Sequence, residues 1–150
     1  METLERARKT RRDCQALVAT VRCGPGRGLA ALRLIDDSGN AAEHFIPFAV
    51  HEMPSQKGHD YTYAGLISAL ERLRSLDVRR VLLQTDDETV VAEIQRRADP
   101  HRDLTLPYII LGCKLNEFAS AKIIAVPAQR LAALRAKASA LASTVYQSVA

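Results

Sequence analysis

The sequence contains no tryptophan, and aromatic residues make up only 5% of its 150 residues. Proteins that bind single-stranded nucleic acid often stack bases on aromatic side chains, and this sequence offers no evident platform of that kind. No apolar run is long enough to cross a bilayer. The charged start of the chain has no hydrophobic signal core, so we expect neither membrane insertion nor export.

Cysteine is scarce and scattered along the chain. Cys14, Cys23 and Cys113 form no CxxC pair, and their number is odd. This pattern argues against a disulfide framework and against a zinc knuckle. It fits a reducing compartment, and we expect a cytoplasmic protein.

Acidic residues are absent after Glu117, whereas the first twelve residues are dense in cations. Overall, 21 lysines and arginines face 17 acids, for a net charge of +4. This mild excess permits phosphate binding without requiring it. If nucleic acid binds, we expect the contacts to come from Arg8, Lys9, Arg11, Arg12, Arg27, Arg130, Arg135 and Lys137.

Strand patterns dominate the first third of the sequence. β-branched and apolar runs predict strands, with glycine-rich turns between the first two and after the second, over residues 15–23, 29–36 and 43–50. Pro47 cannot donate a ladder hydrogen bond, so it indicates an edge strand or a bulge. Three consecutive strands with short turns form an antiparallel meander.

Helices and strands alternate in the rest of the chain. Apolar spacing and capping signals predict helices over residues 63–76, 88–97, 107–119 and 128–146, and short apolar runs predict strands over 80–85 and 121–126. The fold class is therefore α/β, with a mixed five-stranded sheet and helices on its faces. We expect a basic lead-in over residues 1–14 and a single domain over 15–150.

This order of elements resembles the ribonuclease H-like superfamily. Short motifs support the resemblance: the GPG turn at 24–26, the TYAGL helix start at 62–66, the LQTDD strand end at 83–87 and the ASALA segment at 138–142. They resemble, in order, the Gly-Asn-Pro-Gly, Asn-x-Ala-Glu-Leu, Thr-Asp-Ser and Ala-Asp-x-Leu-Ala segments of cellular ribonucleases H. The resemblance implies a fold that holds two divalent metal ions on four carboxylates for phosphodiester hydrolysis.

The sequence departs from this family at three of the four carboxylate positions. The first-strand stretch 18–21 has no acid, the family glutamate falls on Gly65, and the last-helix aspartate falls on Ser139. Only Asp86 remains, with Asp87 beside it. Magnesium needs oxygen ligands, so we predict a catalytically degenerate domain without a cofactor; magnesium or manganese would bind, at Asp86, only if the chain were active.

Several of these residues also have a structural interpretation. Asp86 or Asp87 could cap the helix that follows, and Asp36 with Asp37 fits an ordinary turn. The turn at 24–28 lacks the strand–loop–helix setting of phosphate-binding loops. His44, His51 and His59 match no common metal spacing.

The cationic segments have alternatives too. The basic lead-in is either an arm that contacts a nucleic-acid backbone or a solvated tail. Arg130, Arg135 and Lys137 fit the solvent face of an amphipathic helix, whose apolar stripe would be Leu131, Leu134, Ala138 and Leu141.

Three functions follow from the sequence. The first is a non-catalytic module that binds RNA, DNA or their hybrid. The second is a protein-interaction, structural or self-associating module that uses the sheet edge near Phe45, Ile46 and Phe48 or the apolar stripe of the last helix. The third is a metal-dependent nuclease with a rearranged acid set of Asp86, Asp87 and Asp36 or Asp60.

Overall fold

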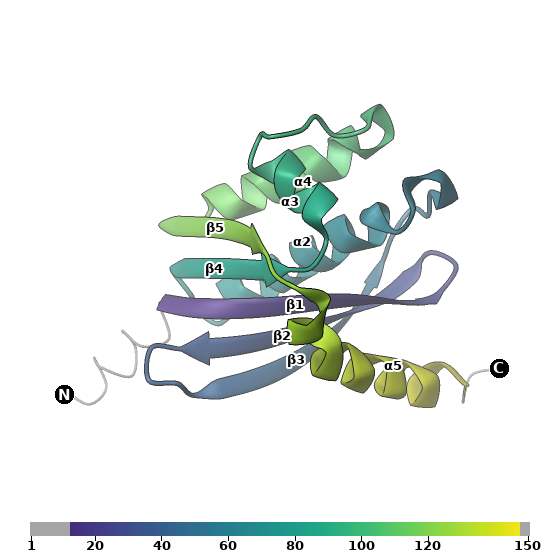
Figure 1. The fold of residues 1–150 in the computed structure, drawn as a ribbon. Helices are drawn as coiled ribbons and strands as arrows, with labels where there is room; N and C mark the ends of the chain where they lie inside the picture. Colours follow the sequence, from purple (N-terminus) through teal and green to yellow (C-terminus); the bar gives the residue numbers. More distant parts are fainter. Residues whose placement is uncertain (1–12, 148–150) are drawn as a thin grey trace.

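A mixed five-stranded sheet forms the centre of the computed structural model, which describes residues 13–147 and side chains up to residue 144. Its spatial order is β3-β2-β1-β4-β5. β1 to β3 pair antiparallel, while β4 and β5 run parallel to β1. The strands span β1 Asp13–Gly24, β2 Arg27–Asp36, β3 Ala41–Ala49, β4 Arg80–Thr85 and β5 Ser120–Ala125. The predicted sheet is confirmed, and Pro47 lies on an edge strand (Figure 1).

Alternating side chains of β1 point into two separate hydrophobic cores. Ala16 and Val18 belong to the larger core beneath the helices α2, α3 and α4, and Leu17 and Ala19 to the smaller core beneath α5. Figure 1 shows α2, α3 and α4 on one face of the sheet and α5 on the other. Because the middle of β1 is covered on both faces, its sequence over residues 16–19 is continuously apolar rather than alternating.

The helices on the first face begin and end near the predicted residues. α2 spans His59–Ser75, α3 spans Glu88–Ile94 and α4 spans Thr105–Asn116. α2 begins four residues before the prediction, after Gly58, whose φ of 89° only glycine adopts readily. α3 ends three residues early, because Arg96 turns left-handed with φ 61°.

The predicted last helix is divided into two parts. A 3₁₀ turn, η3 (Ala128–Leu131), precedes α5 (Ala132–Gln147). Leu131, Leu134 and Ala138 are buried as predicted, but Leu141 is exposed and Ala142 occupies the core instead. Within the described residues no helix has the length and apolar character needed to cross a membrane.

One hydrogen bond joins two polar groups inside the larger core. Tyr63 of α2 is fully buried, and its hydroxyl donates to Oε1 of the buried Glu93 of α3 at 2.7 Å. Burial, and then the neighbouring Glu93 carboxylate, raise the pKa of Tyr63 well above its ordinary value, so this hydroxyl stays protonated as a donor. The bond fixes α3 against α2.

Replacing Tyr63 by phenylalanine tests how much this hydrogen bond contributes to the free energy of unfolding. Tyr63→Phe leaves the Glu93 oxygen without its donor, and we expect a loss of about 1–3 kcal/mol in the free energy of unfolding. The matched control Tyr108→Phe removes the same hydroxyl from a half-buried site on α4 and should cost about 0.5 kcal/mol or less. Urea titration measures both, and equal losses would contradict a special role for Tyr63.

Candidate functional site

The carboxyl end of β4 is where the candidate site lies. β4 ends at Thr85, and Asp86 and Asp87 follow directly. Side chains from α2 and α5, on opposite faces of the sheet, reach these two aspartates. Ligands of open α/β sheets bind beyond the carboxyl ends of parallel strands, so this is the natural position for a site.

Asp86 forms a two-bond ion pair with Arg135 of α5. Arg135 Nη1 donates to Asp86 Oδ2 at 2.8 Å, and Nη2 donates to Oδ1 at 3.0 Å. The aspartate side chain is 20% exposed and the arginine side chain 34% exposed. Bidentate geometry and partial burial make this a strong pair. The guanidinium engages both carboxylate oxygens, so each oxygen of Asp86 has a cationic donor.

Asp87 has a different structural role. Its Oδ1 accepts a hydrogen bond from the backbone N–H of Val90 at 3.1 Å, which makes Asp87 the N-cap of α3. Its Oδ2 lies 2.8 Å from Nδ1 of His59 in the first turn of α2. The predicted helix cap is therefore confirmed for Asp87, while Asp86 beside it pairs with Arg135.

Gly65 lies where the resemblance places the family glutamate. This position is buried on α2, and the methyl group of Thr20 on β1 fills the space that a Cβ atom would need. A longer side chain could enter only if Thr20 moved. The close approach of α2 to β1 explains why glycine stands at this position.

The remaining acids of the rearranged set also have structural partners. Asp36 accepts from the N–H groups of Ser38 and Asn40, as the predicted turn requires. Asp60 is 2% exposed and accepts from the N–H groups of Met53 and Tyr61 at 2.7 and 3.0 Å.

Across the described part of the chain, no group of three or more His, Cys, Asp or Glu residues is arranged to hold a metal ion. Position 139, the family's last-helix acid, is a serine. A pair of divalent cations needs several anionic oxygens. The donor set, a single family carboxylate bonded to an arginine, does not fit such a pair.

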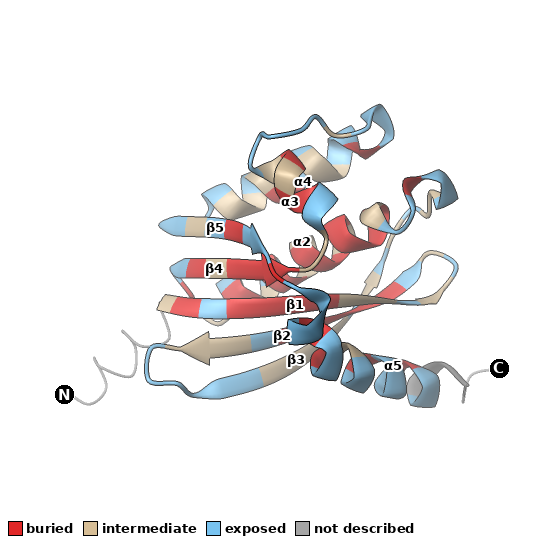
Figure 2. Cartoon of the chain, in the orientation of Figure 1, coloured by how far each residue is buried: buried red, intermediate tan, exposed pale blue. Residues whose placement is uncertain are grey.

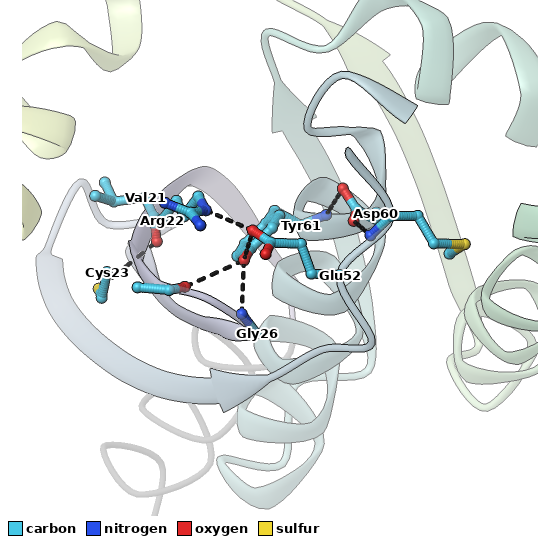
Figure 3. Close-up of polar contacts among 9 residues, drawn as sticks. Val21, Arg22, Cys23, Gly26, Glu52, Asp60 and Tyr61 are labelled. Carbon is cyan, nitrogen blue, oxygen red and sulfur yellow. Dashed lines mark hydrogen bonds and ion pairs between the residues drawn. The ribbon is translucent and has the colours of Figure 1, made fainter. Parts of the chain in front are cut away.

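A second polar cluster holds the β1–β2 hairpin against α2 (Figure 3). The Tyr61 hydroxyl donates to Oε1 of Glu52 at 2.7 Å and accepts from the N–H of Gly26 at 3.0 Å. Arg22 Nε donates to the same Glu52 oxygen at 2.6 Å. These residues border a hollow of about 440 Å³, which is lined by Thr20, Arg22, Glu52, Met53, Pro54, Gly58, Asp60 and Tyr61.

The charges in this cluster are set by their partners. The hydrogen bond from Arg22, followed by that from Tyr61, lowers the pKa of Glu52. Burial, followed by the bond to Glu52, raises the pKa of Tyr61. Glu52 is therefore a carboxylate at neutral pH, and Tyr61 remains a donor. The sequence did not point to this cluster, because Arg22 and Glu52 lie 30 residues apart and no local pattern links them.

The residues predicted to contact nucleic acid differ in exposure and in ion-pair partners. Arg8, Lys9, Arg11 and Arg12 lie outside the described residues. Arg27 and Arg130 are exposed. Arg135 has Asp86 as its partner, and Lys137 Nζ lies 2.8 Å from Oε1 of Glu43. Arg135 and Lys137 thus each form an ion pair with an acidic residue of the same chain.

The apolar surface predicted on β3 is largely covered. Phe45 packs against the core beneath α5, and Ile46 packs against the larger core. The Phe48 ring meets Tyr61 edge-on, with the ring centroids 6.3 Å apart. Phe45, Ile46 and Phe48 are all half-buried. A contact through the free edge of β3 stays a prediction. The most exposed large apolar side chains lie on α4.

The packing of Thr20 against Gly65 has a measurable consequence. In an ordinary helix interior Gly→Ala stabilises by about 1 kcal/mol, but here the new methyl collides with Thr20. We expect Gly65→Ala to lower the free energy of unfolding by about 1–3 kcal/mol. In a Thr20→Ala background the collision is relieved, so the same change should be neutral or stabilising. Denaturant titration of the wild type, the two single variants and the double variant measures these effects. A stabilising Gly65→Ala in the native background would contradict the close contact between α2 and Thr20.

Comparison with known proteins places this geometry in context. No family model matches the sequence, and no curated protein matches it. Among solved structures, ribonuclease H1 from Halobacterium salinarum NRC-1 is similar with a TM-score of 0.64 at 22% identity, over 77% of this chain and 86% of that one. The N-terminal ribonuclease H domain of a Mycobacterium tuberculosis protein, solved as a maltose-binding-protein fusion, gives 0.63 at 18% identity, over 92% of this chain and 100% of that one.

A third similar structure contains a nucleic acid. LC11 ribonuclease H1 in complex with an RNA/DNA hybrid has a TM-score of 0.63 at 16% identity, over 82% of this chain and 91% of that one. At these identities the likeness concerns the fold. The predicted architecture is confirmed: the chain has a ribonuclease H-like fold.

Proposed function

We propose that this chain is a non-catalytic ribonuclease H-like module that binds nucleic acid. The observation that carries the proposal is the ion pair between Asp86 and Arg135. In two-metal hydrolysis the cations polarise the phosphodiester, activate water and stabilise the leaving oxygen. An arginine held on the remaining family carboxylate can bind a phosphate but cannot deliver a metal-activated water.

The glycine at position 65 supports the same proposal. Regaining the family glutamate would require the Thr20 methyl to move, so a single substitution cannot rebuild the acid set. Asp87 is committed to the α3 cap and to His59. The residues around the carboxyl end of β4 thus stabilise the fold. They do not supply the set of carboxylates that two-metal hydrolysis needs.

Three exposed cations mark the surface that we propose for binding. Arg27 follows the β1–β2 turn, Lys57 precedes α2 and Arg130 lies in η3 just after β5. All three lie toward the end of the sheet where β4 and β5 terminate, and none makes an ion pair with the residues that the structure describes. We call Arg27, Lys57 and Arg130 the basic edge. The RNA/DNA hybrid bound to the similar LC11 structure suggests the class of ligand.

Titration of labelled single-stranded RNA, duplex DNA and RNA–DNA hybrid, at two salt concentrations and with magnesium or manganese, tests the proposal. We expect salt-dependent binding and no shortening of any strand. Neutralising the basic edge (Arg27→Gln, Lys57→Gln and Arg130→Gln together) should weaken binding. It should also reduce the slope of log K against log salt by about 0.7–0.9 for each phosphate that the variant no longer neutralises.

Arg79→Gln is the matched control, because Arg79 is exposed and directly precedes β4 at the opposite end of the sheet. It removes one positive charge and should leave the salt slope nearly unchanged. Equal effects of Arg79→Gln and of each single basic-edge variant would refute the proposed surface. Cleavage that disappears in Asp86→Asn would refute the non-catalytic assignment.

A further inference from the structure

Helix α4 exposes a continuous apolar stripe to solvent. Its only buried residue is Leu111. Leu106, Ile109 and Ile110 are 68%, 51% and 37% exposed, and Cys113 is also exposed. The spacing of three, four and seven residues places these side chains on one face of the helix. We call Leu106, Ile109, Ile110 and Cys113 the α4 stripe; Figure 2 shows α4 mostly in the exposed and intermediate colours.

The α4 stripe is continuous with the neighbouring edge of the sheet. A hollow of about 550 Å³ lies between α4, the end of α3 and β5, and Ile109, Cys113 and Ile124 line it. Ile124 on the edge strand β5 is itself 36% exposed. Single exposed apolar residues are common, but a contiguous patch of this kind marks an interaction surface.

We propose that the α4 stripe binds a second copy of this chain, with the two α4 helices antiparallel about a two-fold axis. In a two-fold interface, if residue i contacts residue j of the partner, j contacts i. The stripe is symmetric about the point between Ile109 and Ile110. An antiparallel pair centred there sets Leu106 against the partner's Cys113, and Ile109 against the partner's Ile110.

The charges at the two ends of α4 favour a second copy in this orientation. Arg102 and Asp103 lie at the start, in a 3₁₀ turn that leads into α4, and Lys114 and Glu117 lie at the end. The Arg102 side chain is 92% exposed, and that of Glu117 is 44% exposed. Their contacts within the chain, Arg102 with Asp103 at 4.0 Å and Glu117 with Arg74 at 3.7 Å, are long surface pairs that contribute little. The antiparallel register brings Arg102 opposite the partner's Glu117, and Asp103 near the partner's Lys114.

A parallel arrangement would instead set each of these charges against its own copy. Like charges that face each other destabilise an interface. The antiparallel orientation is therefore the one in which opposite charges of the two copies face each other. It shares no residue with the basic edge, so association and nucleic-acid binding can succeed or fail independently.

Light scattering across a range of concentrations tests for the dimer. We expect the wild-type protein to dimerise and Ile109→Glu to raise the dissociation constant by about tenfold or more, because the new carboxylate would be buried among apolar groups. Leu141→Glu is the matched control, since Leu141 is 39% exposed on α5, on the opposite face of the sheet. It should leave the dimer intact. Circular dichroism verifies that both variants fold.

Oxidative cross-linking tests the register. Leu106→Cys should form a disulfide-linked dimer with the partner's Cys113, and the double variant with Cys113→Ser should not. Wild-type Cys113 should not link to the partner's Cys113, which lies opposite Leu106 in this register. The seven residues between Leu106 and Cys113 set the two thiols about 10 Å apart along the helix axis, beyond the ~7 Å Cα limit of a disulfide. A monomer at all concentrations, a dimer insensitive to Ile109→Glu, or cross-linking through Cys113 alone would overturn the proposal.

Discussion

The ion pair between Asp86 and Arg135 connects the two faces of this protein and determines what its site can do. Asp86 lies where β4 ends, and Arg135 projects from α5 on the opposite face from α2, α3 and α4. In a metal-dependent nuclease this carboxylate would be one of several that share cations. Here Arg135 donates to both oxygens of this carboxylate, and in our proposal this pair takes the place of a carboxylate–cation contact.

The residues around the Asp86–Arg135 pair are held by packing and by hydrogen bonds within the chain. Thr20 packs where an acid side chain on α2 would begin, and His59 with the α3 N-terminus engages Asp87. The hairpin end of β1 is fixed by Tyr61 through bonds to Glu52 and Gly26. The scaffold keeps its shape through hydrogen bonds and packing. The basic edge that we propose for nucleic-acid binding lies toward the carboxyl ends of β4 and β5.

Local patterns predicted the elements well, because strand and helix periodicities are short-range. The bounds of β4 are the predicted ones, and the Asp87 cap follows from an aspartate that precedes a helix. The partners of Asp86 and Glu52 were not predictable, since Arg135 and Arg22 lie 49 and 30 residues away. The exposure of α4 also escaped prediction. Its apolar sequence is typical of a core helix, and only the tertiary arrangement, beside an edge strand, leaves Leu106 and Ile109 uncovered.

The central claim, that Arg135 stands in for metal at Asp86, is tested most directly by adding paramagnetic manganese to the isotope-labelled protein and recording amide spectra. Bound manganese broadens the signals of nearby amides strongly, even when it occupies a small fraction of the molecules. The account predicts no selective broadening at Thr20, Asp86 or Asp87. Selective broadening of these three amides at substoichiometric manganese would show a metal site at the end of β4 and would contradict the account.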